Sequence, residues 1–422
     1  MVWVQTPAVF AFRPWSVFHK GNPHMTDRPL RVLHFDHTAR WSGGEIALLR
    51  MVEAMDPGLV DSTVLLAEDG PLRTALESGG TKVLVEPLAA EVRNARKESI
   101  DARSTGRVRA IGVVFSYVLR VARIARSLRA DVIHTNSLKA DLIGGFAGRL
   151  AGIPVVWHVH DHIEEPYLPR FAVVAFRLLV RILPRHVVGV SSSVLERIFP
   201  GGGDRGWRCG TVVHGGIDPE GGGSWPEAAP APRHGNPPVI GIVGRLARWK
   251  GQHVFLEAAR LLRERGIDAR FVIVGTALFG EDDYAAELRR FVESSDLGAI
   301  VEFAGFSDRI PETLRTFDVC VHASISPEPF GQVVIEAMAA GVPVVAADAG
   351  GVKEIVEDGV SGLLVPPGDA SALADAIAGL LSDRDRSDAI AGAGYARMAS
   401  TFTAANTARK MERVLTHVAR RR

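Results

Sequence analysis

The chain has little cysteine and almost no net charge. Only two cysteines, Cys209 and Cys320, occur among 422 residues, far apart and outside any metal-ligand spacing. Neither a disulfide framework nor a zinc ribbon is therefore expected. A formal net charge of +1 at pH 7 gives no reason to expect a nucleic acid or another polyanion as partner. These absences suit a protein of the reducing cytoplasm.

Long apolar runs are also scarce. The segment 111–119 is among the longest, and Arg120 follows it at once, whereas a membrane-spanning helix needs about 18 consecutive apolar residues. Near the N-terminus, tryptophan, proline and arginine interrupt the chain where a signal peptide would have a clean apolar core. We therefore predict no membrane span, and a disordered extension over residues 1–28 in which Met25 is an alternative start.

What the sequence does contain is a regular alternation of strand and helix patterns. From Arg31 onward, short runs rich in β-branched residues alternate with longer helical stretches, which is typical of βαβ units and parallel sheets. The length and the share of hydrophobic residues, 47%, suit two globular cores. We predict an α/β fold with two Rossmann-like, doubly wound domains. Strands are expected at 31–35, 63–66, 131–134, 153–160 and 186–190, the last of which closes the first series, and then at 239–243, 271–274, 301–303, 319–322 and 342–345.

A segment rich in glycine and proline separates the two halves. Between Pro219 and Pro238 the chain holds three consecutive glycines and several prolines, which resist helix and strand formation. Because open α/β sheets bind ligands at the carboxyl ends of their strands, two such domains would face one cleft. The expected organisation is an N-terminal domain over 29–218, a linker over 219–237, a C-terminal domain over 238–400 and a final helix over 401–422, free to pack back on the N-terminal domain.

The most specific motif places Glu328 and Glu336 around a glycine-containing turn, in the order Glu-Pro-Phe-Gly-Gln-Val-Val-Ile-Glu. The pattern predicts a strand that ends near Ala323, a loop, and a helix that begins near Gly331. Glu336, one turn into the helix, is placed to accept hydrogen bonds from ribose hydroxyls, and Glu328, in the loop, can reach the hydroxyls of a sugar. An isolated pair of this kind is more often a surface loop with a capping glutamate.

The start of this helix is a candidate site for a diphosphate. The first amide groups of a helix lack intrahelical partners, and the helix dipole favours an anion beside them. The amides of Gly331, Gln332 and Val333 occupy these positions in the predicted helix. We therefore expect phosphate oxygens to bind there.

Two cations on a loop of the same domain strengthen this interpretation. The sequence Gly-Arg-Leu-Ala-Arg-Trp-Lys-Gly at 244–251 follows the first strand of the second half. Arg245 offers a planar fork for phosphate oxygens and Lys250 a point charge. Fixed cations stabilise the negative charge that a departing diphosphate develops. Neither half has a complete Gly-x-Gly-x-x-Gly, so a nicotinamide or flavin dinucleotide is disfavoured.

Taken together, these motifs resemble the GT-B glycosyltransferases commonly called family 4. The resemblance runs from about Arg31 to about Leu381 and is strongest in the segments 305–310, 328–346 and 350–368. It implies a retaining enzyme without a cofactor, which transfers a sugar from a UDP- or GDP-sugar to a glycan, a lipid-linked molecule or a small molecule. The donor would bind mainly to the C-terminal domain and the acceptor mainly to the N-terminal domain.

The resemblance also assigns roles residue by residue. Arg245 and Lys250 match the diphosphate-binding pair, Glu336 the ribose ligand and Glu328 the residue beside the donor sugar. The remaining donor contacts that it implies are the backbone near Gly275 and Phe306 for the base, Phe330 at the start of the motif helix, and Gly43 and Gly44 in a phosphate-facing loop of the N-terminal domain.

A histidine-rich strand end is open to two interpretations. The sequence Trp-His-Val-His-Asp-His at 157–162 places His158, His160 and His162 on one face of an extended strand. Three imidazoles could hold zinc in a hydrolase, but no second cluster of ligands accompanies them. The family resemblance instead matches His160 to the histidine that faces the transferring sugar. We predict no metal site.

A second metal motif is equally weak. Asp383 and Asp385 have the Asp-x-Asp spacing, but charges alternate from Ser382 to Asp388 after a helix. We predict a solvated loop there. No metal ligand is expected from this segment.

Two arginine-rich segments without acids, 104–130 and 166–185, leave membrane contact open. In the first, an apolar stripe that includes Val114, Phe115, Val118 and Val121 recurs at helical spacing. Such a helix suits an anionic membrane surface and a lipid-linked acceptor, and it equally suits a core-facing helix with a solvated basic face. Oligomeric state is not predicted. The alternatives to a transferase are a nucleotide-sugar epimerase on the same fold and a non-catalytic subunit that binds nucleotide sugar.

Overall fold

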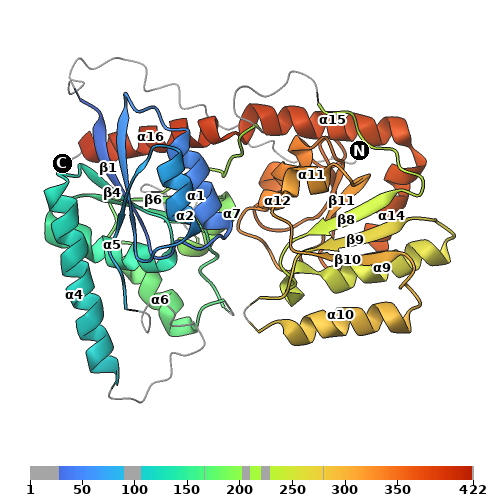
Figure 1. Cartoon of the computed structure of the whole chain (residues 1–422), viewed down its shortest axis with the longest axis horizontal. Coiled ribbons are helices and arrows are strands. Elements are labelled where there is room, and N and C mark those ends of the chain that lie inside the picture. The colour runs from blue at the N-terminus through green and yellow to red at the C-terminus, as the bar shows by residue number, and fades with distance from the viewer. Residues whose placement is uncertain are drawn as a thin grey trace, which may run out of the picture.

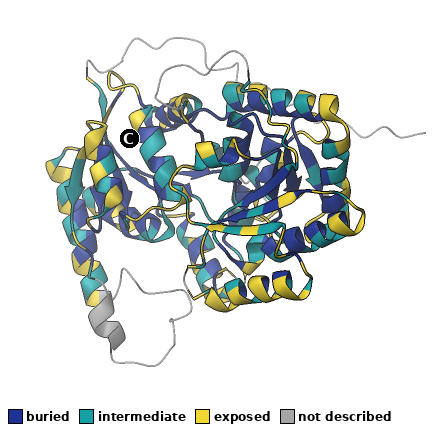
Figure 2. Ribbon diagram, turned by 45° about the vertical axis from the view of Figure 1, so that its right-hand side comes forward, coloured by how far each residue is buried: buried dark blue, intermediate teal, exposed yellow. Residues whose placement is uncertain are grey.

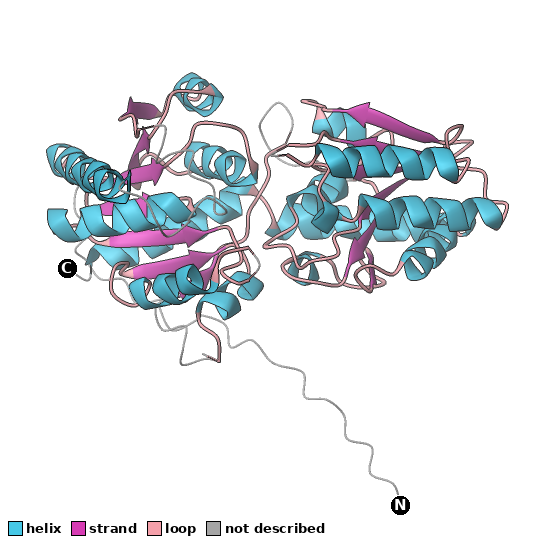
Figure 3. Cartoon of the chain, turned by 90° about the horizontal axis from the view of Figure 1, so that it is seen from below, coloured by secondary structure: helices cyan, strands magenta, loops and turns pink. Residues whose placement is uncertain are grey.

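The computed structural model describes residues 28–89, 106–165, 167–201, 210–219, 229–278 and 280–420, and in the helix that begins at residue 106 it describes side chains from residue 112. Two α/β units lie side by side, each a parallel sheet flanked by helices (Figures 1 and 3). The predicted extension before residue 28, Cys209 and the central part of the linker lie outside the described residues. Among the described helices, none combines the length and apolarity needed to cross a bilayer.

The N-terminal unit is built on a seven-stranded parallel sheet in the order β3-β2-β1-β4-β5-β6-β7. Its strands are β1 (Leu30–Asp36), β2 (Val60–Leu66), β3 (Lys82–Val85), β4 (Val132–Thr135), β5 (Val155–Val159), β6 (His186–Gly189) and β7 (Gly210–Val212). Its helices are α1 (Gly43–Glu53), α2 (Pro71–Ser78), α4 (Gly106–Ser127), α5 (Leu138–Ala151), α6 (Arg170–Leu179) and α7 (Ser192–Ile198). The prediction that 186–190 closes the strand series was wrong, because β7 adds a short parallel edge strand.

The C-terminal unit has a six-stranded parallel sheet in the order β10-β9-β8-β11-β12-β13. Its strands are β8 (Val239–Val243), β9 (Arg270–Val274), β10 (Val301–Gly305), β11 (Val319–His322), β12 (Val344–Ala347) and β13 (Leu363–Val365). Its helices are the 3-10 turn η3 (Arg248–Lys250), α9 (Gln252–Glu264), α10 (Asp282–Ser294), α11 (Ile310–Leu314), α12 (Gln332–Ala339), α13 (Val352–Ile355), α14 (Ala370–Ser382) and α15 (Arg384–Thr401).

The last helix, α16 (Ala404–Arg420), returns to the N-terminal unit, where it packs beside α1 (Figure 1). Met411 and Leu415 are fully buried in one core with Leu48 and Met51 of α1. The return is fixed by the backbone, since Ile217 donates to the carbonyl of Phe402 at 3.0 Å. The chain therefore crosses between the two units twice.

Two helix layers cover opposite faces of the N-terminal sheet. The layer of α4, α5 and α6 shares one core, and the layer of α1, α2 and α16 shares another. Helices of both units bury one face and expose the other (Figure 2). In α4, Val118 and Val121 are buried and Val114 is half-buried, so most of the predicted stripe packs on the sheet, whereas Phe115 is 58% exposed.

The segment from Ser382 to Asp388 is not the predicted loop. Asp383 caps α15, because its side chain accepts a hydrogen bond from the backbone amide of Arg386 at 3.0 Å. Asp385 lies in the first turn of that helix, where a carboxylate is stabilised by the helix dipole. The spacing of the two aspartates is therefore explained by helix capping.

Candidate active site

The loop after β8 carries Lys250 to the end of β11. Gly251, which follows it, has φ of 73°, and a Cβ at this position would lie 1.9 Å from the carbonyl oxygen of Ala323. Only glycine permits that close approach of the two backbones. As a result the Nζ atom of Lys250 lies 2.6 Å from Oε1 of Glu328.

Glu328 is a buried carboxylate surrounded by donors. Its Oε1 atom also lies 2.9 Å from Nε2 of His322 and accepts a hydrogen bond from the hydroxyl of Ser324. Burial by itself would raise the pKa of Glu328, but Lys250 and His322 together hold it well below its ordinary value. Glu328 is therefore ionised, and a positive charge is fixed beside it.

Arg245 lies on the same loop and faces a different partner. Its Nε atom is 3.3 Å from Oε2 of Glu281, and its guanidinium lies 5.9 Å from the ring centre of Trp249. The ammonium of Lys250 lies 4.5 Å from the centre of the same ring. One tryptophan thus packs between two cations, a favourable contact for each of them.

Helix α12 begins after Gly331, whose φ of 103° turns the chain into the helix. One turn later, Oε1 of Glu336 accepts hydrogen bonds from Arg50 and from Gln332, each at 3.3 Å. Arg50 comes from α1 of the other domain, so this ion pair joins the two units. Burial raises the pKa of Glu336, and Arg50 only partly opposes the shift.

On the N-terminal side, Asn136 organises the loops that follow β1, β4 and β5. Its Nδ2 atom donates to Oδ2 of Asp36 at 2.8 Å and to the carbonyl of Gly44 at 3.0 Å, and its Oδ1 lies 3.0 Å from Nε2 of His160. Both amide hydrogens are used, so Oδ1 is an acceptor and Nε2 of His160 carries a proton. Burial lowers the pKa of His160 to about 4, which leaves a neutral ring with Nδ1 as acceptor.

Glu45 adds a partly protonated carboxyl group to the N-terminal wall of the site, to which Asp36, Asn136 and His160 also belong. It is buried in the first turn of α1 and accepts a hydrogen bond from Ser42. Burial, with the negative charge of Asp36 nearby, raises the pKa of Glu45 to about 7. The adjacent Gly43 faces the C-terminal unit, where a Cβ on it would lie 3.9 Å from Oε1 of Gln332.

Comparison with known proteins decides the family. The family described as "Glycosyltransferase Family 4" matches residues 41–220, and "Glycosyl transferases group 1" matches residues 225–397. A 2-deoxystreptamine glucosyltransferase of Streptomyces kanamyceticus is 30% identical over 284 residues, which cover 62% of this chain and 70% of that protein. The chain belongs to the group 1 glycosyltransferases.

Other relatives of this group 1 glycosyltransferase agree with the assignment. HepE of Anabaena, solved in complex with UDP and glucose, superimposes with a TM-score of 0.75 at 27% identity and covers 92% of this chain and 99% of its own. A D-inositol 3-phosphate glycosyltransferase of Corynebacterium urealyticum is 41% identical over 180 residues. That match spans 41% of each chain, less than half the length of the relative. The predicted GT-B architecture of two parallel-sheet α/β domains is confirmed.

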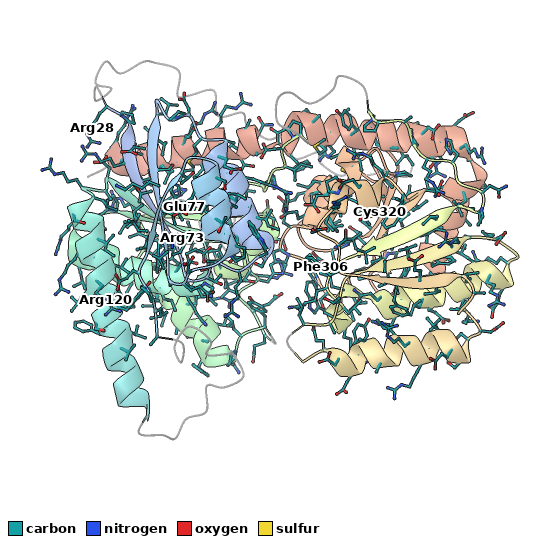
Figure 4. The ribbon with its side chains drawn as sticks, viewed as in Figure 1. Arg28, Arg73, Glu77, Arg120, Phe306 and Cys320 are labelled. Atoms are coloured by element: carbon teal, nitrogen blue, oxygen red, sulfur yellow. The ribbon has the colours of Figure 1, made fainter. Side chains whose placement is uncertain are left out.

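The predicted donor-site residues of the group 1 glycosyltransferase come from loops that meet at the carboxyl ends of the C-terminal strands. Lys250 and Glu328 are in contact, and Glu336 lies one helical turn inside α12. Gly275 directly follows β9, and Phe306, 78% exposed, directly follows β10 on the side that faces the N-terminal unit (Figure 4).

The side chains of Phe330, His158 and His162 each contact other side chains of the protein. Phe330 is buried against His214 and Phe402, with ring centres 5.9 Å and 6.0 Å away, so its side chain packs where the chain crosses between the units. His158 contacts the buried His134, whereas His162 lies 3.1 Å from the hydroxyl of Ser193. Within the described ranges, no group of three histidine, cysteine or acidic side chains is arranged to hold a metal.

Several residues of the site were missed in the sequence. Asn136 and Asp36 stand at the carboxyl ends of β4 and β1, and His322 ends β11. Their place after buried strands is the signal that could have found them, because ligand-binding side chains gather at that edge of a parallel sheet. Arg50 had no such signal, since it lies within a helix and reaches Glu336 only through the orientation of the two units.

Proposed function

We propose that this chain is a retaining glycosyltransferase, which moves a sugar from a nucleoside diphosphate sugar to a hydroxyl group of an acceptor. The observation that carries the proposal is Lys250, held at 2.6 Å from the ionised Glu328 next to the N-terminus of α12. A fixed cation and the free amides of a helix start together suit a diphosphate. Arg245 on the same loop adds a second cation.

The donor is bound mainly by the C-terminal unit in this proposal. The diphosphate lies between Lys250, Arg245 and the amides of Gly331 to Val333, and Glu336 accepts hydrogen bonds from the ribose hydroxyls. HepE was solved with UDP and with UDP-glucose, and a mycobacterial relative is named as dependent on GDP-mannose. We propose a UDP- or GDP-sugar and do not choose between the bases.

The transfer keeps the anomeric configuration by reaction on one face of the sugar. The bond between the anomeric carbon and the diphosphate oxygen breaks, and its electron pair stays on the diphosphate. The acceptor oxygen forms the new bond on the same face, and its proton passes to the departing diphosphate. Lys250 and Arg245 stabilise the developing charge, a role that elsewhere falls to a divalent metal, so we propose a metal-independent reaction.

The N-terminal wall contributes groups that suit hydroxyls rather than phosphates. The neutral His160 has an acceptor nitrogen at Nδ1, oriented through Asn136. We propose that His160 accepts a hydrogen bond from a hydroxyl of the transferring sugar, with Gly43 and Gly44 close to the diphosphate. The acceptor is a glycan, a lipid-linked molecule or a small molecule. We propose that the enzyme is located in the cytoplasm.

Sugar transfer is favoured over the two alternatives by the relatives, which are named as transferases of glucose, mannose and other sugars. An epimerase would convert the nucleotide sugar without an acceptor. A non-catalytic subunit would bind it and turn nothing over. The intact set of Lys250, Glu328 and Glu336 supports catalysis.

The test is a panel of UDP- and GDP-sugars screened by thermal shift, followed by measurement of released UDP or GDP with candidate acceptors and chelator present. One nucleotide sugar is expected to raise the Tm and to release its diphosphate only when an acceptor is added. NMR of the product should show the anomeric configuration of the donor. An inverted product, or activity that the chelator abolishes, would contradict the mechanism.

A further inference from the structure

The helix α6 leaves a continuous apolar stripe without a partner. Phe171, Val174, Leu178 and Ile182 are 59%, 50%, 57% and 55% exposed. Their spacing of three or four residues places them along one side of the helix and the turn after it. The opposite side, with Val173 and Phe176, is buried in the core. In the folded protein, α6 therefore exposes an apolar face to solvent.

The stripe continues onto α5. Phe146 and Leu150, 45% and 43% exposed, lie one helical turn apart beside Arg149. The Nε atom of Arg149 donates to the carbonyl of Ile182 at 3.0 Å, which joins the two helices at this edge. We call the surface formed by these six apolar residues the α5–α6 face: Phe146, Leu150, Phe171, Val174, Leu178 and Ile182. Both helices lie in the same layer beside α4 (Figure 1).

The exposed charges on the two helices that form this face are positive. No acidic residue occurs in the segments 142–160 and 166–195, and the loop between them holds Asp161, Glu165 and Glu164, the last of which pairs with Arg197. The exposed cations of the two segments are arginines, Arg149, Arg170, Arg181 and Arg185. An apolar centre with a rim of arginines matches the boundary of an anionic bilayer, where acyl chains meet lipid phosphates. The arginines favour a negatively charged surface, and the apolar centre favours one in which the exposed apolar side chains can be buried.

The α5–α6 face is connected directly to the proposed acceptor wall. In the sequence, only nine residues separate His160 from Arg170, the first residue of α6. We propose that the α5–α6 face docks on an anionic membrane and that the acceptor is a lipid-linked molecule, whose head group reaches the site from this side of the N-terminal unit. The identity of the acceptor rests on the proposed function, whereas the docking does not.

The test uses the full-length protein and flotation with vesicles of phosphatidylcholine alone or mixed with phosphatidylglycerol. Wild-type protein should float with the anionic vesicles and not with the neutral ones. The double variant Phe171→Glu/Leu178→Glu should lose at least tenfold in partitioning. A matched control is Leu59→Glu/Val360→Glu, because these residues are 44% and 50% exposed and lie outside the face. This control should float like wild type.

A second variant separates charge from apolar area. Arg170→Ala/Arg181→Ala should weaken flotation severalfold and reduce its dependence on salt. Equal flotation of wild type and Phe171→Glu/Leu178→Glu would overturn the docking, as would equal binding to neutral vesicles. A wild-type dimer that this variant converts to a monomer, without vesicle binding, would show that the face joins two copies and would also overturn it.

Thermal shift with the donor nucleotide distinguishes a failure of the membrane docking from a failure of the proposed function. Phe171→Glu/Leu178→Glu should bind the donor like wild type, since these residues lie outside the donor site. Loss of vesicle binding with retained donor binding supports membrane docking. If wild type binds anionic vesicles but none of the nucleotide sugars, the proposed function is refuted and the docking stands.

Discussion

The C-terminal and N-terminal walls of the site differ in the charge state of their buried ionisable groups. In the C-terminal wall, Lys250 and His322 hold the pKa of the buried Glu328 well below its ordinary value. In the N-terminal wall no such cation accompanies Glu45, whose pKa burial raises to about 7, and burial lowers the pKa of His160 to about 4. The C-terminal wall therefore has a fixed cation beside an ionised carboxylate and suits a diphosphate. In the N-terminal wall, His160 is neutral and Glu45 is partly protonated beside the ionised Asp36, which suits hydroxyls.

The difference arises from what the neighbouring elements supply. The loop after β8 brings Lys250 to within 2.6 Å of Glu328, and a close opposite charge outweighs the cost of burial. On the N-terminal side, Asn136 supplies hydrogen bonds but no charge. Polar groups that are satisfied without ions can stay neutral in a buried position.

The largest effect is expected from removing the cation of the C-terminal wall. Lys250→Ala should lower kcat/KM for the donor by about a thousandfold, because a fixed charge on the leaving group is lost and Glu328 is left buried without its partner. Release of UDP or GDP measures this effect. Lys353→Ala is the matched control, since Lys353 pairs with Asp348 in an exposed position of the same domain. Turnover of Lys250→Ala at the wild-type rate would remove the site assignment.

The N-terminal wall can be tested through pH. The pKa of Glu45 rises from 4.5 to about 7 on folding, so the native state holds a proton that the unfolded state releases. The free energy of unfolding therefore falls as pH rises from 4.5 through 7. Glu45→Gln, which can still accept from Ser42, should be more stable than wild type at pH 8 by up to about 3 kcal/mol. Near pH 4.5 the two should be alike.

Thermal melts at both pH values measure this prediction. Glu77→Gln in α2 is the control, because Glu77 is a surface residue paired with Arg73 and should change little at either pH. A stability gain of Glu45→Gln that is equal at both pH values would show that Glu45 is charged throughout. The contrast between the walls would then fail.

The fold could be predicted from the sequence because parallel strands buried on both faces appear as short runs of β-branched residues. The runs at 239–243 and 319–322 correspond to β8 and β11. The edge strands β3, β7 and β13 were missed. They are as short as β11, but β3 and β7 contain no fully buried residue and β13 has only three residues, whereas all four residues of β11 are buried. They therefore lack a distinct buried apolar run.

The spatial grouping of the proposed donor-site residues could be predicted in part for a similar reason. Loops that follow the strands of one parallel sheet meet at one edge, so the two ends of the glutamate motif and the loop of Arg245 and Lys250 had to come close. The direct contact of Lys250 with Glu328 could not be predicted, because it depends on the backbone approach at Gly251. The contact of Arg50 with Glu336 depends on how two separate units are oriented.

A moderate effect is expected where the two walls touch. Glu336→Ala should raise the KM for the donor about ten- to a hundredfold, because hydrogen bonds from the ribose to a charged acceptor are worth about 1.5–3 kcal/mol. The kcat should change less, since the ribose is bound in both ground and transition states. Glu302→Ala, which breaks an exposed pair with Arg270, is the control. An unchanged KM in Glu336→Ala would place the ribose elsewhere.

The smallest effect is expected from the orienting amide. Asn136→Asp replaces the donor to Asp36 and to the carbonyl of Gly44 with an acceptor, so His160 and the glycine loop should shift. We expect kcat to fall about tenfold, since small displacements of positioned groups reduce rates. The KM for the donor should change less than kcat, because in the proposed function the donor is bound mainly by the other wall. A large rise in that KM with normal kcat would contradict the division of roles.

The central claim is that Lys250 and the start of α12 bind a diphosphate. Calorimetric titration of wild type and Lys250→Ala with UDP, GDP and the corresponding monophosphates tests it most directly. Wild type should bind one diphosphate at least tenfold more tightly than its monophosphate, and Lys250→Ala should lose most of that preference. A preference that survives intact in Lys250→Ala, or wild type that binds monophosphate and diphosphate equally, would contradict the account.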